Sequence, residues 1–253
     1  MIIMENKIGN RISAEYYSFL KKHTQTTYQD TKLLGKYYTD CSVAADLVDT
    51  IVQHINNSDC TDLKIIDPFC GDGRLILLLL KNMVNSGKIS QWRKILITLW
   101  EIDYDALEIA RKSISKYCQT NDVNYELNLK NCDAFVEYSN VESQYDVCVT
   151  NPPWCLLKPQ KTIDNGDVEM YRNILEQYDM YIKEILPMSQ PSSKFGKWGT
   201  NLARCGIEVA LRLIDGKGIC GIVSPASLFN DQVSRVCQEF CVNRFNKQHR
   251  IAA

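Results

Sequence analysis

The stretch that decides the fold is residues 63–73, which read Leu63-Lys64-Ile65-Ile66-Asp67-Pro68-Phe69-Cys70-Gly71-Asp72-Gly73. Its apolar first half predicts a buried strand, and its two glycines predict a tight turn that lets a ligand approach the backbone. A helical pattern follows over residues 74–85, so the turn opens onto the amino end of a helix. The turn has neither the Gly-Lys pattern of triphosphate sites nor the third glycine of dinucleotide sites.

Short apolar runs and amphipathic segments alternate on both sides of this stretch. The pattern predicts further strands and helices, with strands over 95–100, 125–129, 145–150 and 219–223 and helices over 42–55, 105–119 and 202–214. Such alternation is typical of an α/β fold with a mainly parallel sheet and helices on both faces. Ligands bind such sheets at the carboxyl ends of the strands, so we expect the functional residues to follow directly after each strand.

An acidic residue follows each of the first three predicted strands. Asp67 ends the first strand and suits a ligand with an ammonium group, because it would repel a phosphate. Glu101 follows the second strand, where a carboxylate accepts the hydroxyls of an unphosphorylated ribose. Asp133 follows the third and could accept a hydrogen bond from an adenine amino group. Singly each acid could be a cap or a surface residue, but together they predict a nucleoside site.

Asn151-Pro152-Pro153-Trp154 follows the fourth predicted strand. Two consecutive prolines fix the backbone and remove two N–H donors, so the carbonyls nearby are left as acceptors. The Asn151 side chain adds another acceptor, and Trp154 offers a flat face for a planar group. The tetrapeptide therefore predicts a site that holds an NH2 group with its lone pair aimed at an electrophile.

These motifs resemble the amino-methylating branch of the class I methyltransferases, most closely the adenine-specific DNA methyltransferases of restriction-modification systems. The cofactor loop at 67–73 and the tetrapeptide at 151–154 carry the resemblance, together with the amino-terminal motif at 35–39 and the later helix and strand at 202–225. The match runs over about residues 33–242 in the family's order. It implies a Rossmann-like fold, S-adenosylmethionine as the cofactor, and double-stranded DNA with a flipped adenine as the substrate.

The resemblance also implies the role of each site residue. The implied cofactor-binding residues are Tyr38, Thr39, Asp67, Phe69, Gly71, Gly73, Glu101, Ile102, Asp133, Ala134 and Asn151, and the implied catalytic residues are Asn151, Pro152, Pro153 and Trp154. Three positions depart from the family's pattern. Asp40 stands where proline is usual, Asp72 where serine or threonine is common, and Trp154 where tyrosine or phenylalanine is more frequent.

Composition restricts the setting of this activity. The start of the chain has no signal-peptide pattern and no apolar run is long enough to span a bilayer, so we expect a cytoplasmic protein with no membrane partner. The 11 cysteines are scattered without a Cys-x-x-Cys pair, which indicates buried free thiols and no metal site. The formal net charge of −1 offers little attraction for DNA, and the two basic groups could be only solvated faces, at Arg235, Arg244, Lys247 and Arg250 and at Lys158, Lys161, Lys194 and Lys197.

We expect a helical extension over residues 1–32 and a catalytic domain over 33–253, with a lid or docking insertion at 156–200. The class I sheet would need two more strands after the last predicted helix, near 231–243, and the family would add a target-recognition domain. We therefore expect a sheet lacking its last two strands and a specificity subunit or domain elsewhere.

Two other functions fit the same residues. The Asn-Pro-Pro-aromatic arrangement serves any planar amine, so a protein glutamine or an RNA base could be the acceptor. The chain could also be a cofactor-binding subunit that is inactive without a partner.

Overall fold

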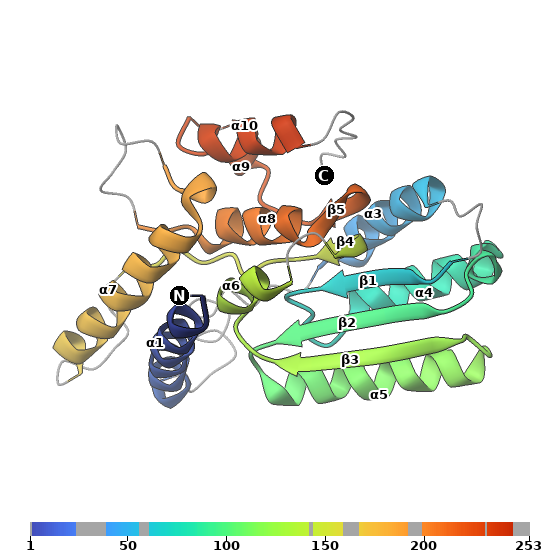
Figure 1. Ribbon diagram of the computed structural model, residues 1–253, viewed down its shortest axis with the longest axis horizontal. Helices are drawn as coiled ribbons and strands as arrows, with labels where there is room; N and C mark the ends of the chain where they lie inside the picture. Colours follow the sequence, from blue (N-terminus) through green and yellow to red (C-terminus); the bar gives the residue numbers. More distant parts are fainter. Residues whose placement is uncertain are drawn as a thin grey trace.

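The computed structural model describes residues 2–23, 39–55, 61–141, 144–158, 167–191, 199–230 and 232–244. Five strands in these residues form one parallel sheet in the order β3-β2-β1-β4-β5 (Figure 1). They are β1 (Leu63–Asp67), β2 (Ile95–Glu101), β3 (Tyr125–Asn131), β4 (Tyr145–Thr150) and β5 (Ile214–Ile222). The predicted α/β fold with a parallel sheet is confirmed.

The strand order reverses at β1. The chain runs from β1 outward to β2 and β3, then returns to the other side of β1 for β4 and β5. At such a point the loops after the two central strands separate, and a crevice opens at the carboxyl edge of the sheet. The loops after β1 and β4 carry the glycine turn and the Asn-Pro-Pro-Trp tetrapeptide.

The first strand's predicted bounds match β1, whereas β5 begins at Ile214, earlier than the predicted residue 219. Tyr145 of β4 pairs with Ile214, but Val147 pairs with Ile219, so the register shifts between them. The intervening residues are the polar Asp-Gly-Lys-Gly run at 215–218, which has no strand-like alternation. The apolar pattern therefore revealed only the second half of this strand.

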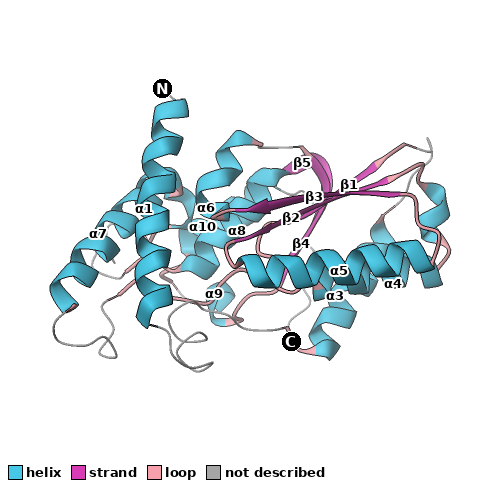
Figure 2. Ribbon diagram, turned by 90° about the horizontal axis from the view of Figure 1, so that it is seen from below, coloured by secondary structure: helices cyan, strands magenta, loops and turns pink. Residues whose placement is uncertain are grey.

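One face of the sheet is covered by α3 (Cys41–His54), α4 (Arg74–Asn85) and α5 (Tyr104–Thr120), which lie together beneath it in Figure 2. Buried aliphatic residues of these helices pack against Ile65, Ile97 and Val149 of the strands. Asp40, a departure from the family's pattern, is the N-cap of α3, and its carboxylate accepts a hydrogen bond from the Ser42 backbone N–H at 2.8 Å.

The other face is covered by α1 (Ile2–His23), α6 (Ala134–Glu137), α7 (Val168–Ile185) and α8 (Leu202–Leu213). The strand side chains Ile66, Trp100 and Cys148 point to this layer. Helices α1 and α7 lie side by side in both ribbon views, and the rings of Tyr16 and Tyr178 stack between them with centroids 4.4 Å apart (Figures 1 and 2).

Helix α7 lies inside the interval predicted to be a lid or docking insertion. Its face Tyr171, Leu175, Tyr178 and Ile182 is buried in the core, so this part of the interval belongs to the folded body. The spacing of these residues is helical, and it was missed because polar residues surround it. The role of the insertion as a lid or docking surface stays a prediction.

The remaining described elements are short. They are η1 (Lys88–Gln91), η2 (Tyr138–Asn140), η3 (Pro187–Ser189), α9 (Ser227–Asn230) and α10 (Arg235–Arg244). Helix α10 begins four residues after the predicted start at 231 and packs on α8. Within the described ranges, no helix is both long enough and apolar enough to cross a membrane.

Candidate active site

A cavity opens at the carboxyl ends of β1 to β4 and gathers most of the predicted site residues. Those lining it are Thr39, Asp67, Phe69, Gly71, Glu101, Ile102, Asp133, Ala134, Asn151 and Pro153. Gly73, Pro152 and Trp154 lie beside the cavity without lining it, and Tyr38 falls outside the described residues. The loops after four separate strands therefore converge on one space, as the topology requires.

Asp67 places a buried carboxylate at the centre of the cavity. Its Oδ1 accepts hydrogen bonds from the Thr150 hydroxyl at 2.6 Å and the Phe69 backbone N–H at 3.1 Å. Burial, as the largest cause, raises the pKa of Asp67 to about 7. No lysine or arginine of the described residues forms an ion pair with this carboxylate. Such a site suits a cationic group of a ligand.

Glu101 is tied into the glycine turn. Its two carboxylate oxygens accept hydrogen bonds from the backbone N–H groups of Gly71 and Asp103, at 2.8 and 2.9 Å. Carboxylate oxygens are acceptors, which is the property that a ligand hydroxyl requires. Gly71 has a φ of +52° and no atom within 4 Å of where a Cβ would lie, so the turn leaves open space beside Glu101.

Gly73 has a packing role at the start of α4, and its predicted part in cofactor binding stays a prediction. It is the N-cap of α4 with a φ of 79°, and a Cβ there would lie 2.7 Å from the Cβ of Ala110. The second glycine of the turn thus lets α4 and α5 pack closely. Asp72 between the two glycines forms an ion pair with Arg74 at 2.7 Å, and both residues line the cavity.

Asp133 lines the cavity, but three donors already bind its carboxylate. Oδ1 accepts a hydrogen bond from the Phe135 backbone N–H at 2.9 Å as the N-cap of α6. Oδ2 accepts hydrogen bonds from the hydroxyls of Ser13 in α1 and Tyr178 in α7, at 2.7 and 2.8 Å. The strand-end position of this acid could be predicted. Its hydroxyl partners could not, because they come from helices 120 positions before it and 45 positions after it in the sequence.

Asn151 lines the cavity at the end of β4. Its Nδ2 donates a hydrogen bond to the Thr39 hydroxyl at 3.0 Å, and Thr39 itself is buried. This contact fixes the orientation of the amide, so the Nδ2 edge faces Thr39 and the Oδ1 edge is turned away from it. The two residues are 112 positions apart, and both were predicted to belong to the site.

The tetrapeptide is clamped by α8 and by the segment before it. Leu157 N–H donates to the Thr200 carbonyl and Leu202 N–H to the Cys155 carbonyl, each at 2.8 Å. Pro152 packs onto Gly206 of α8, where a Cβ would lie 2.1 Å from the Pro152 Cβ. Gly206 was not predicted as a site residue, and its place in an otherwise ordinary helical pattern gave no signal.

Trp154 does not line the cavity. Its partly buried ring packs against the cluster formed by Ala203, Ile207, Leu211, Leu228 and Cys237. Asn151 and Pro153 thus face the cavity while Trp154 faces α8 and α10. The predicted stacking of Trp154 on a target group stays a prediction.

Aromatic residues also line the cavity, of which Phe69 was predicted and Tyr17 and Phe135 were not. Tyr17 of α1 lines it, and the rings of Phe69 and Phe135 approach each other with centroids 5.0 Å apart. Tyr17 follows directly on Tyr16, which belongs to the apolar face of α1. That face indicated a packed helix, but nothing in the sequence shows which part of the sheet it covers.

The chain is similar to one family of known proteins. Residues 10–194 match the sequence model of the family described as N-6 DNA Methylase. A stretch of 131 residues is 30% identical to the type II methyltransferase M.VspI of Vibrio sp. (strain 343), covering 52% of this chain and 28% of that protein.

Solved structures share the fold at low sequence identity. A protein from Listeria monocytogenes assigned to the class I S-adenosylmethionine-dependent methyltransferases superposes with a TM-score of 0.55 at 14% identity, over 88% of this chain and 55% of that one. The DrdV–DNA complex superposes with a TM-score of 0.59 at 17% identity, over 92% of this chain and 24% of that one. A modification subunit assigned to a type I restriction enzyme from Vibrio vulnificus YJ016 superposes with a TM-score of 0.52 at 13% identity, over 88% of this chain and 41% of that one.

The chain spans about a quarter of the length of the curated relative it matches, and between a quarter and just over half of these structural neighbours. The family match nevertheless extends from α1 through α7 and includes the cofactor loop, the three acids and the tetrapeptide. The sheet is that of a class I methyltransferase. The chain therefore belongs to the N-6 DNA methylase family, whose cofactor is S-adenosylmethionine.

Proposed function

We propose that this chain is the catalytic portion of a DNA methyltransferase that transfers a methyl group from S-adenosylmethionine to the exocyclic amine of adenine. One observation carries the proposal. The residues suited to a nucleoside with an ammonium group, Asp67 and Glu101, share a single cavity with the amine-presenting residue Asn151. Family membership supports DNA as the substrate, and the family's name supports position N6 of adenine.

The cavity fits this cofactor in charge and in shape. Asp67 has no cationic partner among the described residues, which suits the ammonium of the methionine part. Glu101 lines the cavity with a carboxylate, an acceptor suited to the ribose hydroxyls, and Gly71 leaves the space beside it open. Apolar residues also line the cavity, including Ile102, Ala134 and Phe135. When bound, the cofactor supplies an electrophilic methyl group on a sulfonium.

The tetrapeptide would hold the acceptor amine. The Asn151 Oδ1 and the Pro152 carbonyl accept hydrogen bonds from the NH2 group, which reduces the conjugation of its lone pair with the ring. Thr39 fixes the Asn151 amide, and Gly206 fixes Pro152, so both acceptors are positioned before the substrate binds. Preorganised acceptors of this kind lower the barrier by positioning and electrostatics, without a strong base.

An adenine inside a duplex cannot reach this cavity, so the base would be flipped out at a cost of about a few kcal/mol. Trp154 stands next to the acceptors, outside the cofactor cavity, where its ring could stack on the extruded base. Because the relatives are much longer than this chain, we place recognition of the DNA sequence in a separate domain or specificity subunit.

The test is to incubate the chain with tritiated S-adenosylmethionine and, in parallel, duplex DNA, RNA and a translation release factor. Digestion and chromatography would identify the labelled product. The proposal predicts label in N6-methyladenine from DNA. Label in RNA or in glutamine instead of DNA would contradict the proposal and identify RNA or the release factor as the substrate. Calorimetric binding of the cofactor without transfer to any substrate would identify a cofactor-binding subunit and overturn the proposal.

A further inference from the structure

Helix α1 reaches the cavity through its side chains although it lies outside the sheet and its loops. Tyr17 lines the cavity, and the Ser13 hydroxyl donates to Asp133 Oδ2 at 2.7 Å. Tyr178 of α7 donates to the same oxygen at 2.8 Å, and the Tyr17 and Tyr178 hydroxyl oxygens are 3.4 Å apart. A chain of hydroxyl groups thus connects both helices to one carboxylate of the cavity.

This arrangement is buried and rigid. Ser13, Tyr178 and Asp133 are 3%, 0% and 5% exposed, so no competing water reaches these hydrogen bonds easily. Tyr16 stacks on Tyr178 with the two rings 11° from parallel, which limits rotation of the Tyr178 ring. At the end of α1, His23 forms a hydrogen bond of 3.0 Å with Asp167, the N-cap of α7. The two helices therefore hold the hydroxyls in place as a unit.

The hydroxyls decide which oxygen of Asp133 can serve a ligand. Each carboxylate oxygen accepts about two hydrogen bonds. Among the described residues, Oδ2 accepts two hydrogen bonds, from Ser13 and Tyr178, whereas Oδ1 accepts one, from the Phe135 N–H. Oδ1 is thus the oxygen with an acceptor position left, and rotation of the carboxylate would break all three bonds. Burial raises the pKa of Asp133, and the hydroxyl hydrogen bonds oppose that rise by favouring the charged form.

We propose that α1 and α7 contribute positioning residues to the cofactor site. Ser13 and Tyr178 orient the Asp133 carboxylate so that its Oδ1 faces the 6-amino group of the cofactor's adenine. The proposal rests on the proposed function for the identity of the ligand. It adds that recognition of the adenine depends on the docking of α1. By thermodynamic reciprocity, a bound cofactor then stabilises the docked helix to the same degree.

The first test uses two ligands that differ at one group. S-adenosylhomocysteine carries the 6-amino group, and S-inosylhomocysteine carries an oxygen there. Dissociation constants measured by calorimetry for Ser13→Ala and Tyr178→Phe should show adenosyl affinity weakened about five- to tenfold, as expected for lost hydrogen bonds to a charged group. Affinity for the inosyl ligand should change less than twofold, so discrimination between the two falls.

Tyr16→Phe is the matched control, because it removes a buried hydroxyl from the same aromatic cluster without removing a hydrogen bond to Asp133. Its affinities and its discrimination should stay within twofold of the wild type. Equal weakening of both ligands in Tyr178→Phe would mean general damage to the cavity and would overturn the proposal. Unchanged affinity for both ligands would overturn it equally.

The second test measures the coupling directly. Saturating S-adenosylhomocysteine should slow amide hydrogen exchange in residues 7–23 of the wild type, and the effect should be lost in the Ser13→Ala, Tyr178→Phe double variant. No slowing in the wild type would contradict the coupling. Both tests need only binding, so a chain that binds cofactor but methylates no substrate would refute the proposed function alone. A wild type that binds neither ligand would refute both.

Discussion

Asp67 is an anionic side chain that this fold buries without a cation of its own among the described residues. It is 1% exposed, and burial raises its pKa from the ordinary 3.8 to about 7. The Thr150 hydroxyl and the Phe69 N–H offset only part of the cost of removing the charge from water. In our account, the protein keeps this destabilising buried charge because the ammonium group of the cofactor compensates it on binding.

The pH dependence of stability tests this view. Because the folded pKa is raised, the carboxyl contributes most to stability when it is protonated, and that contribution is lost as the pH rises from about 4 toward and through about 7. We expect Asp67→Asn to be more stable than the ligand-free wild type at pH 8 by about 2–4 kcal/mol. The advantage should shrink by pH 5.

Urea unfolding at pH 5 and pH 8 measures this difference. Asp46→Asn, at an exposed position of α3, is the control and should change stability little at either pH. An Asp67→Asn effect of the same size at both pH values would show that the buried charge is not its cause.

At the scale of residues, the sequence predicted the acids and the tetrapeptide because each directly follows a strand. It could not predict their partners. Ser13 and Tyr178 meet Asp133 across 120 and 45 positions, and Gly206 meets Pro152 through close helix packing. Such contacts depend on which helix face lies over which strand end, and apolar periodicity alone does not specify that.

At the scale of elements, α8 supports the tetrapeptide through a position without a side chain. A Cβ at residue 206 would lie 2.1 Å from the Pro152 Cβ and 3.4 Å from a carbon of the Phe69 ring. The helix backbone therefore approaches the Asn-Pro-Pro-Trp turn as closely as the chain allows. Any larger residue at this position must displace the turn or the helix.

We expect Gly206→Ala to reduce kcat by about 10- to 100-fold, because misplacing a reacting group by about 1 Å has effects of this order. Stability should fall by about 1–3 kcal/mol from overpacking. Affinity for S-adenosylhomocysteine should stay within about threefold, since positioning is what is lost. Gly216→Ala in β5, where nothing lies within 4 Å of the new Cβ, is the control. A Gly206→Ala enzyme with normal kcat would show that α8 does not position the turn.

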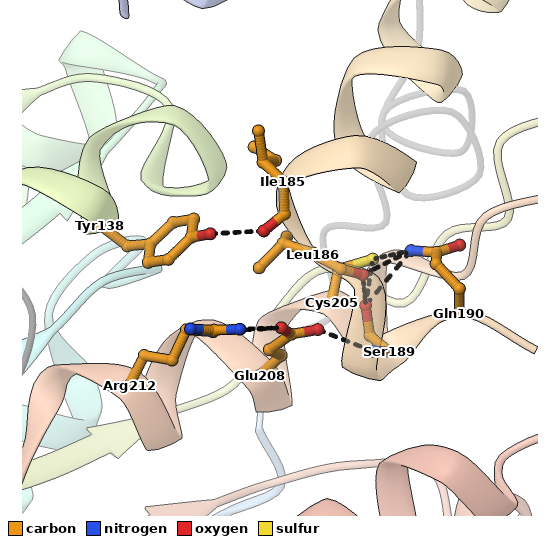
Figure 3. Close-up of polar contacts among 8 residues, drawn as sticks. All are labelled: Tyr138, Ile185, Leu186, Ser189, Gln190, Cys205, Glu208 and Arg212. Atoms are coloured by element: carbon orange, nitrogen blue, oxygen red, sulfur yellow. Dashed lines mark hydrogen bonds and ion pairs between the residues drawn. The ribbon is translucent and has the colours of Figure 1, made fainter. Parts of the chain in front are cut away.

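A buried glutamate joins α8 to the turn that follows α7 (Figure 3). Glu208 is fully buried, and it accepts a hydrogen bond from the Ser189 N–H at 2.7 Å and an ion pair from Arg212 at 2.8 Å. Nearby, the Tyr138 hydroxyl donates to the Ile185 carbonyl at 2.6 Å. The Glu208 contact holds the turn after α7 against α8, and the Tyr138 contact holds the end of α7 against η2.

Removing Glu208 leaves the Ser189 N–H and the Arg212 guanidinium without their acceptor. We expect Glu208→Ala to lower the free energy of unfolding by about 3–5 kcal/mol, as for breaking a buried ion pair. Glu239→Ala removes an exposed ion pair of the same i,i+4 spacing with Arg235 in α10 and should cost less than about 1 kcal/mol. Equal losses in chemical denaturation would contradict the role assigned to Glu208.

The elements themselves were largely predictable, and the exceptions have physical causes. Strong apolar periodicity gave β1, α4 and β4 their predicted bounds. Helix α7 was missed because its narrow buried face lies in a polar interval, and the first half of β5 because it is an irregular, glycine-containing segment.

At the scale of the whole molecule, the chain holds the cavity that we propose to be catalytic but carries little net charge to attract DNA. Its formal net charge is −1, and the relatives extend well beyond the matched region. We expect the chain alone to bind duplex DNA only non-specifically, with a dissociation constant on the order of 10⁻⁴–10⁻⁶ M at physiological salt. Fluorescence anisotropy with duplexes of differing sequence measures this. Tight binding to one sequence would show that recognition resides in this chain.

The central claim is that one cavity holds the methyl donor while Asn151 presents the acceptor amine. Its most direct test is Asn151→Ala, with Asn128→Ala at an exposed position of β3 as the control. Tritium transfer from S-adenosylmethionine to duplex DNA should fall at least about 100-fold in Asn151→Ala, the size expected when a preorganised polar group is lost. S-adenosylhomocysteine should still bind within about threefold of the wild type. Transfer by Asn151→Ala at the wild-type rate would contradict the account.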